Sequence, residues 1–90
     1  MSTPDTPTMH LTISTPDKTL FQGNVHKATF PGSAGAFQVL KNHAPLVSTL
    51  QKGTIRYSDA QQDYTLAIEK GLVEVLNNEL TVLVAASHQQ

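Results

Sequence analysis

The chain has 90 residues, a formal net charge of −1 at pH 7 and no cysteine. This length predicts one domain with a modest core and leaves little room for a deep, enclosed active site. The charge excludes binding of nucleic acid or anionic lipid through a basic surface, and the missing cysteines exclude disulfides and thiolate metal sites.

Both ends of the chain are polar. Residues 1–9, MSTPDTPTM, lack the basic and apolar regions of a signal peptide and predict a flexible arm. Residues 88–90 are expected to be loose, which leaves residues 10–87 as a single domain. No apolar run approaches the ~18 residues that a membrane span needs, so we expect no direct membrane insertion.

Short segments of alternating hydrophobicity fill the domain. In residues 54–58, TIRYS, the alternation places Ile55 and Tyr57 inward and Arg56 and Ser58 outward. The same criteria, alternation or a short apolar run, predict strands at residues 10–14, 19–23, 25–30, 36–40, 46–50, 54–58, 64–69, 72–76 and 80–85.

Glycine, proline, aspartate and asparagine mark the turns between these segments. The polar loop DAQQD, residues 59–63, and the NNE turn, residues 77–79, predict two hairpins. Lys70-Gly71 is expected to end one strand before the next begins at Leu72. Eight or nine short strands without a 3.6-residue period predict an all-β fold, an antiparallel β-sandwich or flattened barrel, without a helical domain.

Two predicted strands, LVEVL and LTVLVA, are apolar on both faces. In the second of them, Leu80, Val82 and Val84 alternate with Leu83. Strands of this kind are covered on both sides, and the second cover is either a loop or arm of this chain or a partner protein. Glu74 falls on the face of its strand that faces away from the valines, where it either contacts solvent or pairs with a basic group on a partner.

The sequence GSAG, residues 32–35, raises the possibility of a phosphate-binding loop. A P-loop requires Gly-Lys-Ser/Thr at the start of a helix, whereas this segment leads into the predicted strand AFQVL. A turn or bulge is therefore favoured over a phosphate site.

His43 is the most plausible candidate for a catalytic or metal-binding side chain. The four histidines lie far apart without zinc-ligand spacing, and no spacing unites His43 with Ser33 or Ser48. A histidine before Ala-Pro can instead donate its ring N–H to a nearby carbonyl and lock a corner. The residues alone therefore indicate a binding or structural module, and a small hydrolase would require His43 within hydrogen-bond reach of a serine.

Three segments together resemble the N-terminal β-sandwich domain of the epsilon subunit of F-type ATP synthase. They are PDKTLFQGNV, PGSAGAFQVLKNHAPLVSTLQKGTIRY and KGLVEVLNNELTVLVA, and the resemblance extends from His10 to about Ser87. It implies a flattened sandwich of about ten strands. It also implies a non-catalytic rotor subunit of the central stalk, without cofactors, on the cytoplasmic face of the bacterial plasma membrane. Such a subunit docks on the gamma subunit and the c-ring and couples proton translocation to ATP synthesis on other subunits.

The resemblance also assigns contact residues. The loop Gly32, Ser33, Ala34 and Gly35 is expected to face the c-ring, although many members carry an acidic residue where this chain has Ala34. The residues expected to face gamma are Thr15, His43, Ala44, Pro45 and Ser48, and the apolar strands add Leu83.

Longer members of the family continue into a two-helix hairpin that can block rotation and, in some members, binds ATP. The chain stops about where that hairpin would begin, so we expect a short form without the helical brake and its ATP site. A free-standing β-sandwich that binds a ligand or protein is the alternative, and it would show a concave, aromatic-lined pocket.

Overall fold

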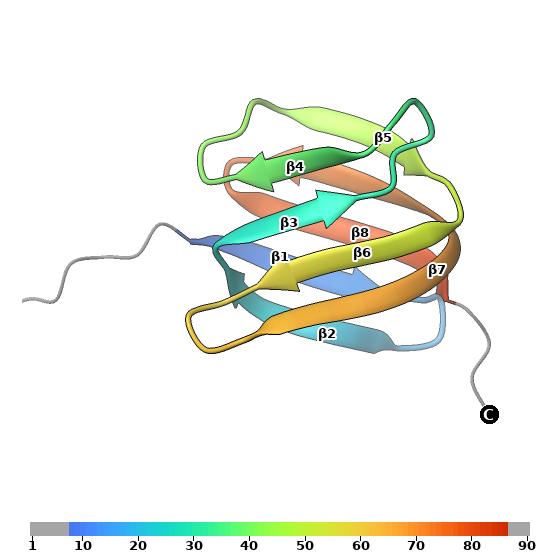
Figure 1. Ribbon diagram of the computed structural model, residues 1–90, viewed down its shortest axis with the longest axis horizontal. Coiled ribbons are helices and arrows are strands. Elements are labelled where there is room, and N and C mark those ends of the chain that lie inside the picture. The colour runs from blue at the N-terminus through green and yellow to red at the C-terminus, as the bar shows by residue number, and fades with distance from the viewer. Residues whose placement is uncertain (1–7, 87–90) are drawn as a thin grey trace, which may run out of the picture.

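The computed structural model describes residues 8–86, which form eight β-strands (Figure 1). The strands are β1 (Met9–Ser14), β2 (Thr19–Val25), β3 (Lys27–Phe30), β4 (Phe37–Leu40), β5 (Leu46–Leu50), β6 (Gly53–Ser58), β7 (Asp63–Leu76) and β8 (Glu79–Ala86). The predicted all-β fold is confirmed. No helix occurs in this part of the chain, so it offers no helical segment that could cross a membrane.

The long strand β7 joins the two layers of the sandwich. Residues 63–68 of β7 pair with β6, whereas residues 71–76 lie between β8 and β5. The sheet order is β2-β1-β8-β7-β6-β3-β4, with β5 on the second half of β7. The sheet folds over along β7, so that β3, β4 and β6 lie in front of β1, β2 and β8 in Figure 1.

The continuity of β7 differs from the prediction. The sequence predicts that one strand ends at Lys70-Gly71 and that another begins at Leu72. The register instead shifts between Ile68 and Lys70, and pairing with β8 continues. A bulge bends a strand without ending it, which is why two of the nine predicted strands are one and the total is eight. The resemblance had implied about ten.

The core between the layers follows the predicted alternation. Leu11, Ile13 and Ile55 are fully buried, as the alternation predicts. Ser58 is the exception: it was predicted to point outward but is only 8% exposed, because it lies between Lys27 on β3 and Asp63 on β7. The buried apolar side chains are Met9, Leu11, Ile13, Val25, Ala28, Phe30, Val39, Leu50, Ile55, Tyr57, Ile68, Val73, Val75, Leu80, Val82 and Val84.

One pairing is parallel, in contrast to the otherwise antiparallel arrangement of the described strands. β1 and β8 run side by side in the same direction, with Leu11 opposite Leu80 and Ile13 opposite Val82. Met9, which the sequence analysis placed in the N-terminal arm, is the buried first residue of β1. Residues 1–7 of the proposed arm and residues 88–90 of the proposed loose end lie outside the described residues.

Gly71 allows β7 and β8 to approach closely just after the bulge. A Cβ atom at this position would lie 2.9 Å from the carbonyl oxygen of Leu83 and 3.1 Å from a methyl group of Val84. The neighbouring backbone cannot move away without disturbing the pairing, so only glycine fits without strain.

We therefore expect Gly71→Ala to destabilise the fold by about 1–3 kcal/mol through overpacking. In a domain of this size that lowers Tm by about 4–8 °C per kcal/mol, measurable by thermal unfolding. Gly23→Ala is the matched control, because its added Cβ would meet only the ring of Phe21, at 3.4 Å. Equal loss of stability in both variants would contradict the argument.

Candidate functional site

The glycine-rich loop between β3 and β4 is a tight turn attached to β5. The Gly35 N–H donates to the Gly32 carbonyl at 2.9 Å, and the Ser33 N–H donates to the Thr49 carbonyl at 3.0 Å. The Thr49 hydroxyl also donates to Ser33 Oγ at 2.9 Å. The Gly32 N–H donates to the Phe30 carbonyl, so three of the amides that a phosphate would require are already bonded.

Both glycines of this loop are required by its geometry. A Cβ on Gly32 would lie 2.6 Å from the Gly35 carbonyl oxygen and 2.8 Å from the Phe37 ring, and Gly35 has φ of +131°. The predicted turn is therefore observed, and it is rigid at its base. Ser33 and Ala34 at its tip are exposed.

The corner that contains His43 is also a built turn. The His43 ring donates from Nδ1 to the Ala44 carbonyl at 2.7 Å, which is the type of bond expected from the sequence. Asn42 has φ of 68°, and its backbone N–H donates to Asn78 Oδ1 at 2.6 Å, while Asn78 Nδ2 donates to Asn42 Oδ1 at 3.1 Å. This reciprocal pair ties the corner to the turn between β7 and β8.

The geometry gives no support for a hydrolase or a metal centre. Within residues 8–86, no hydrogen bond joins His43 to a serine, and the Ser48 hydroxyl donates to the Thr49 carbonyl at 3.0 Å. No three histidine, aspartate or glutamate side chains in this range are placed to hold a metal ion.

The outer surface of β5, β7 and β8 carries an apolar face, which we define as Val47, Leu72, Leu76 and Leu83. Their exposed fractions are 65%, 43%, 46% and 48%, respectively. Leu72 lies opposite Leu83 across β7 and β8, and Thr49 lies opposite Leu72 on β5. A shallow hollow of about 450 Å³ opens beside Leu72 and Leu83, with Pro16 and Ala85 also in its lining.

The outward direction of three of these side chains follows the predicted alternation. Leu72, Leu76 and Leu83 are exposed while the valines between them are buried. Val47 was not predicted as part of this face, although the alternation of LVSTL indicates it. Leu46 and Leu50 share one side of β5, and Val47 lies on the other side with Thr49.

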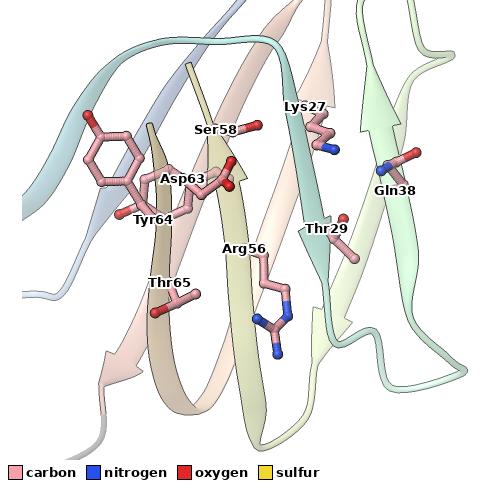
Figure 2. Close-up of a pocket in the computed structure, with 9 residues that line it drawn as sticks. Lys27, Thr29, Gln38, Arg56, Ser58, Asp63, Tyr64 and Thr65 are labelled. Carbon is pink, nitrogen blue, oxygen red and sulfur yellow. The ribbon is translucent and has the colours of Figure 1, made fainter. Parts of the chain in front are cut away.

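The opposite layer presents a mainly polar outer surface (Figure 2), on which Leu40 of β4 is the large apolar side chain exposed among the described residues. In the figure, Lys27 and Thr29 project from β3, Gln38 from β4 and Arg56 from β6. These side chains line a shallow hollow of about 240 Å³. The two faces of the sandwich are therefore chemically distinct, one mainly polar and the other mainly apolar.

Three aromatic side chains pack on one another, and two of them, Tyr57 and Tyr64, also line the polar hollow. The rings of Tyr57 and Tyr64 stack with centroids 5.1 Å apart, and Phe21 lies 4.6 Å from Tyr57 and 5.3 Å from Tyr64. Burial is the main cause that raises the pKa of Tyr57. The other seven residues that line this hollow are polar, so within residues 8–86 it differs from the concave, aromatic-lined pocket expected of a free-standing ligand-binding module.

Asp59 organises the hairpin loop between β6 and β7. Its Oδ1 accepts the Gln61 N–H at 2.8 Å and the Gln62 N–H at 2.9 Å, and its Oδ2 accepts the Tyr64 hydroxyl at 2.9 Å. These three hydrogen bonds lower the pKa of Asp59, and the two backbone amides contribute more than the hydroxyl. The bond between the Tyr64 hydroxyl and Asp59 is also the main cause that raises the pKa of Tyr64.

We expect Tyr64→Phe to raise the pKa of Asp59 while leaving it below the ordinary value, because the two stronger amide donors remain. Since the folded pKa lies below the unfolded one, Asp59 contributes stability above its unfolded pKa, and the contribution is lost as pH falls through its folded pKa. Carboxyl ¹³C NMR titration measures the shift. An unchanged Asp59 pKa in the variant would show that the hydroxyl does not act on it.

The residues expected to face gamma do not gather on one surface. The corner formed by His43, Ala44 and Pro45 comes just before β5. The glycine loop instead pairs with the last residue of β5, through a bridge between Gly32 and Leu50, so the corner and the loop lie at opposite ends of that strand. Thr15 follows β1 at the glycine-loop end, where its hydroxyl oxygen accepts the N–H groups of Asp17 and Lys18 at 3.2 Å.

Ser48 and Leu83 lie apart from the corner. Ser48 is opposite the buried Val73 and therefore lies on the inward-facing side of β5. Leu83 is opposite Ser14, the residue before Thr15, so Leu83 and Thr15 are the members of the set that share a region.

The geometry defines a small β-sandwich domain with a polar and an apolar outer face. The chain belongs to the family described as "ATP synthase, Delta/Epsilon chain, beta-sandwich domain", whose model matches residues 8–89. This confirms the family indicated by the three sequence segments.

Curated relatives named "ATP synthase epsilon chain" align over most of the chain. The protein from Magnetococcus marinus is 38% identical over 77 residues, which cover 86% of this chain and 56% of the relative. The protein from Synechococcus sp. (strain PCC 6716) is 35% identical over 81 residues, covering 90% and 59%. The chain thus spans less than two thirds of the length of these relatives.

Two solved structures share the fold. A chain from the Euglena gracilis mitochondrial ATP synthase, solved with OSCP, F1 and the c-ring, matches with a TM-score of 0.80 at 19% identity, over 92% of this chain and 53% of that one. A chain from the central stalk and c-ring of the Tetrahymena thermophila mitochondrial ATP synthase matches with a TM-score of 0.73 at 16% identity, over 86% and 63%.

Proposed function

We propose that this chain is a non-catalytic rotor subunit of the central stalk of an F-type ATP synthase. The observation that carries the proposal is family membership over residues 8–89, together with epsilon-chain relatives at 35–38% identity. In this role the domain docks on the gamma subunit and the c-ring, and it transmits rotation driven by proton translocation to catalytic sites on other subunits. It resides at the cytoplasmic face of the bacterial plasma membrane as part of the complex.

The apolar face is the proposed docking surface for gamma. Roughly half of each of its leucine side chains is exposed, so covering each one stabilises the complex by ~1 kcal/mol. The three leucines and Val47 supply the apolar anchors of one patch, and the polar residues around them fix the orientation of the partner.

The glycine loop is the proposed contact with the c-ring. Its base is fixed by backbone bonds to β5, while Ser33 and Ala34 project at the tip. The loop carries no charged residue, so we expect shape and backbone polar groups to make this contact. The His43–Pro45 corner at the other end of β5 is a second proposed contact with gamma, as are Thr15 and Ser48.

Close packing suits a part that transmits torque. Proteins have interiors as dense as organic crystals and therefore resist compression. The core residues of both layers meet in one cluster, and the shared strand β7 connects the layers through the backbone. A load applied at one face therefore reaches the other face without a flexible joint.

We expect Leu83→Asp to weaken binding to a co-expressed gamma subunit by at least about tenfold, because the new carboxylate must lose water when the face is covered. Thr65→Asp, which places the same charge on an exposed strand position of the polar face, is the matched control. Co-purification and titration calorimetry measure both. If Leu83→Asp and Thr65→Asp weaken binding equally, the apolar face is not the docking surface.

We expect Ala34→Tyr to weaken association of the assembled gamma complex with purified c-rings by about tenfold, since a bulky ring at the loop tip breaks shape complementarity. Binding to gamma should stay unchanged. Ala60→Tyr, in the loop after β6, is the control because that residue is also exposed. Normal c-ring association of the Ala34→Tyr variant would remove the loop from the contact.

A further inference from the structure

The apolar face surrounds a single carboxylate, that of Glu74. Along β7, Leu72 and Leu76 are the nearest residues on the same side. Across the strands, Val47 lies opposite Glu74 on β5 and Thr81 lies opposite it on β8. The side chain is exposed, and no described residue forms a hydrogen bond or ion pair with it.

Within residues 8–86, no cation on this face is positioned to neutralise Glu74. His10 and Glu79 pair with each other at 2.9 Å at one edge. Lys70 lies at the other end of the same row of β7, with Leu72 between it and Glu74, and no ion pair joins them. A partner that covers the leucines therefore also covers an unpaired negative charge.

The chemistry of that partner follows from the cost of burying the carboxylate. An ionised carboxylate that loses water without gaining a partner destabilises a complex strongly. A lysine or arginine removes this cost, and the aliphatic stem of either side chain can lie along the leucines while its charged end reaches Glu74. A wholly apolar partner would leave the charge unsatisfied.

We propose that the apolar face binds a partner surface that presents one lysine or arginine within a ring of apolar groups, and that Glu74 is the residue that selects it. The inference rests on the proposed function and names the chemistry of the gamma surface. A second copy of this chain does not fit the same face. A two-fold contact centred on the patch would bring two Glu74 carboxylates together, and like charges in direct apposition repel.

The test is the affinity of the co-expressed gamma subunit for the full chain as a function of salt. Glu74→Gln keeps the shape and removes the charge, and we expect at least about tenfold weaker binding and a flatter salt dependence. Asp63→Asn is the matched control, since Asp63 is an exposed acid on the same strand but in the polar layer, and its binding should equal that of the wild type.

A charge-reversal experiment identifies the basic partner. Glu74→Lys should bind more weakly than Glu74→Gln, and exchanging one lysine or arginine of gamma for glutamate should restore its binding. Thermal unfolding of each variant checks that the fold is intact, which is expected because the side chain is exposed.

Two results would overturn the inference. The first is a Glu74→Gln variant that binds gamma with wild-type affinity and salt dependence, which would show that no cation faces the carboxylate. The second is increased self-association of that variant, which would show that Glu74 instead keeps the apolar face soluble. In either case, loss of binding in Leu83→Asp leaves the proposed function intact. A wild-type chain that does not bind gamma removes both the function and the inference.

Discussion

The fold depends on one strand that belongs to both layers. β7 pairs with β6 in its first half and with β5 and β8 in its second half, and the bulge after Ile68 turns it from one layer into the other. Gly71 follows the bulge because the backbone of β8 lies too close for a side chain. If this bend were lost, the two layers could no longer close on a common core.

The bend also determines where the apolar face lies. After the bend, Val73 and Val75 of β7 point into the core, and the residues that alternate with them point outward beside β5 and β8. An outer surface with exposed leucines on neighbouring strands is typical of a protein that is covered by a partner. Among the described residues, the outer surface of the other layer exposes one large apolar side chain, Leu40 on β4, so the cluster of such side chains belongs to one face.

Much of the fold could be predicted from the sequence because alternation reports which face of a strand is buried. The inward positions of Leu11, Ile13 and Ile55 follow from it, and the paired asparagines at 77 and 78 adopt the left-handed angles of a tight turn, with φ of 52° and 62°. The continuity of β7 could not be predicted in this way. Lys70-Gly71 is typical of a turn that ends a strand, and only its pairing with β8 shows that the strand continues.

The candidate surfaces were predictable in part. Leu83 and Glu74 could be assigned to an outward face from periodicity, and the bond of the His43 ring to a carbonyl from its place before Ala-Pro. The link between Asn42 and Asn78 joins residues 36 positions apart, and no local pattern indicates such a contact. The separation of the corner from Thr15 likewise depends on strand order, which the sequence does not specify.

The parallel pairing of β1 with β8 has a consequence for how the chain is made. β1 occupies the middle of its layer, between β2 and β8, so one of its neighbours is the last of the eight described strands to be synthesised. Until β8 has left the ribosome, β1 and β2 can form only a hairpin with an unprotected apolar side. Closing this layer is therefore expected to wait for β8 and to be slow for a domain of this size, because β1 and β8 are far apart in the sequence.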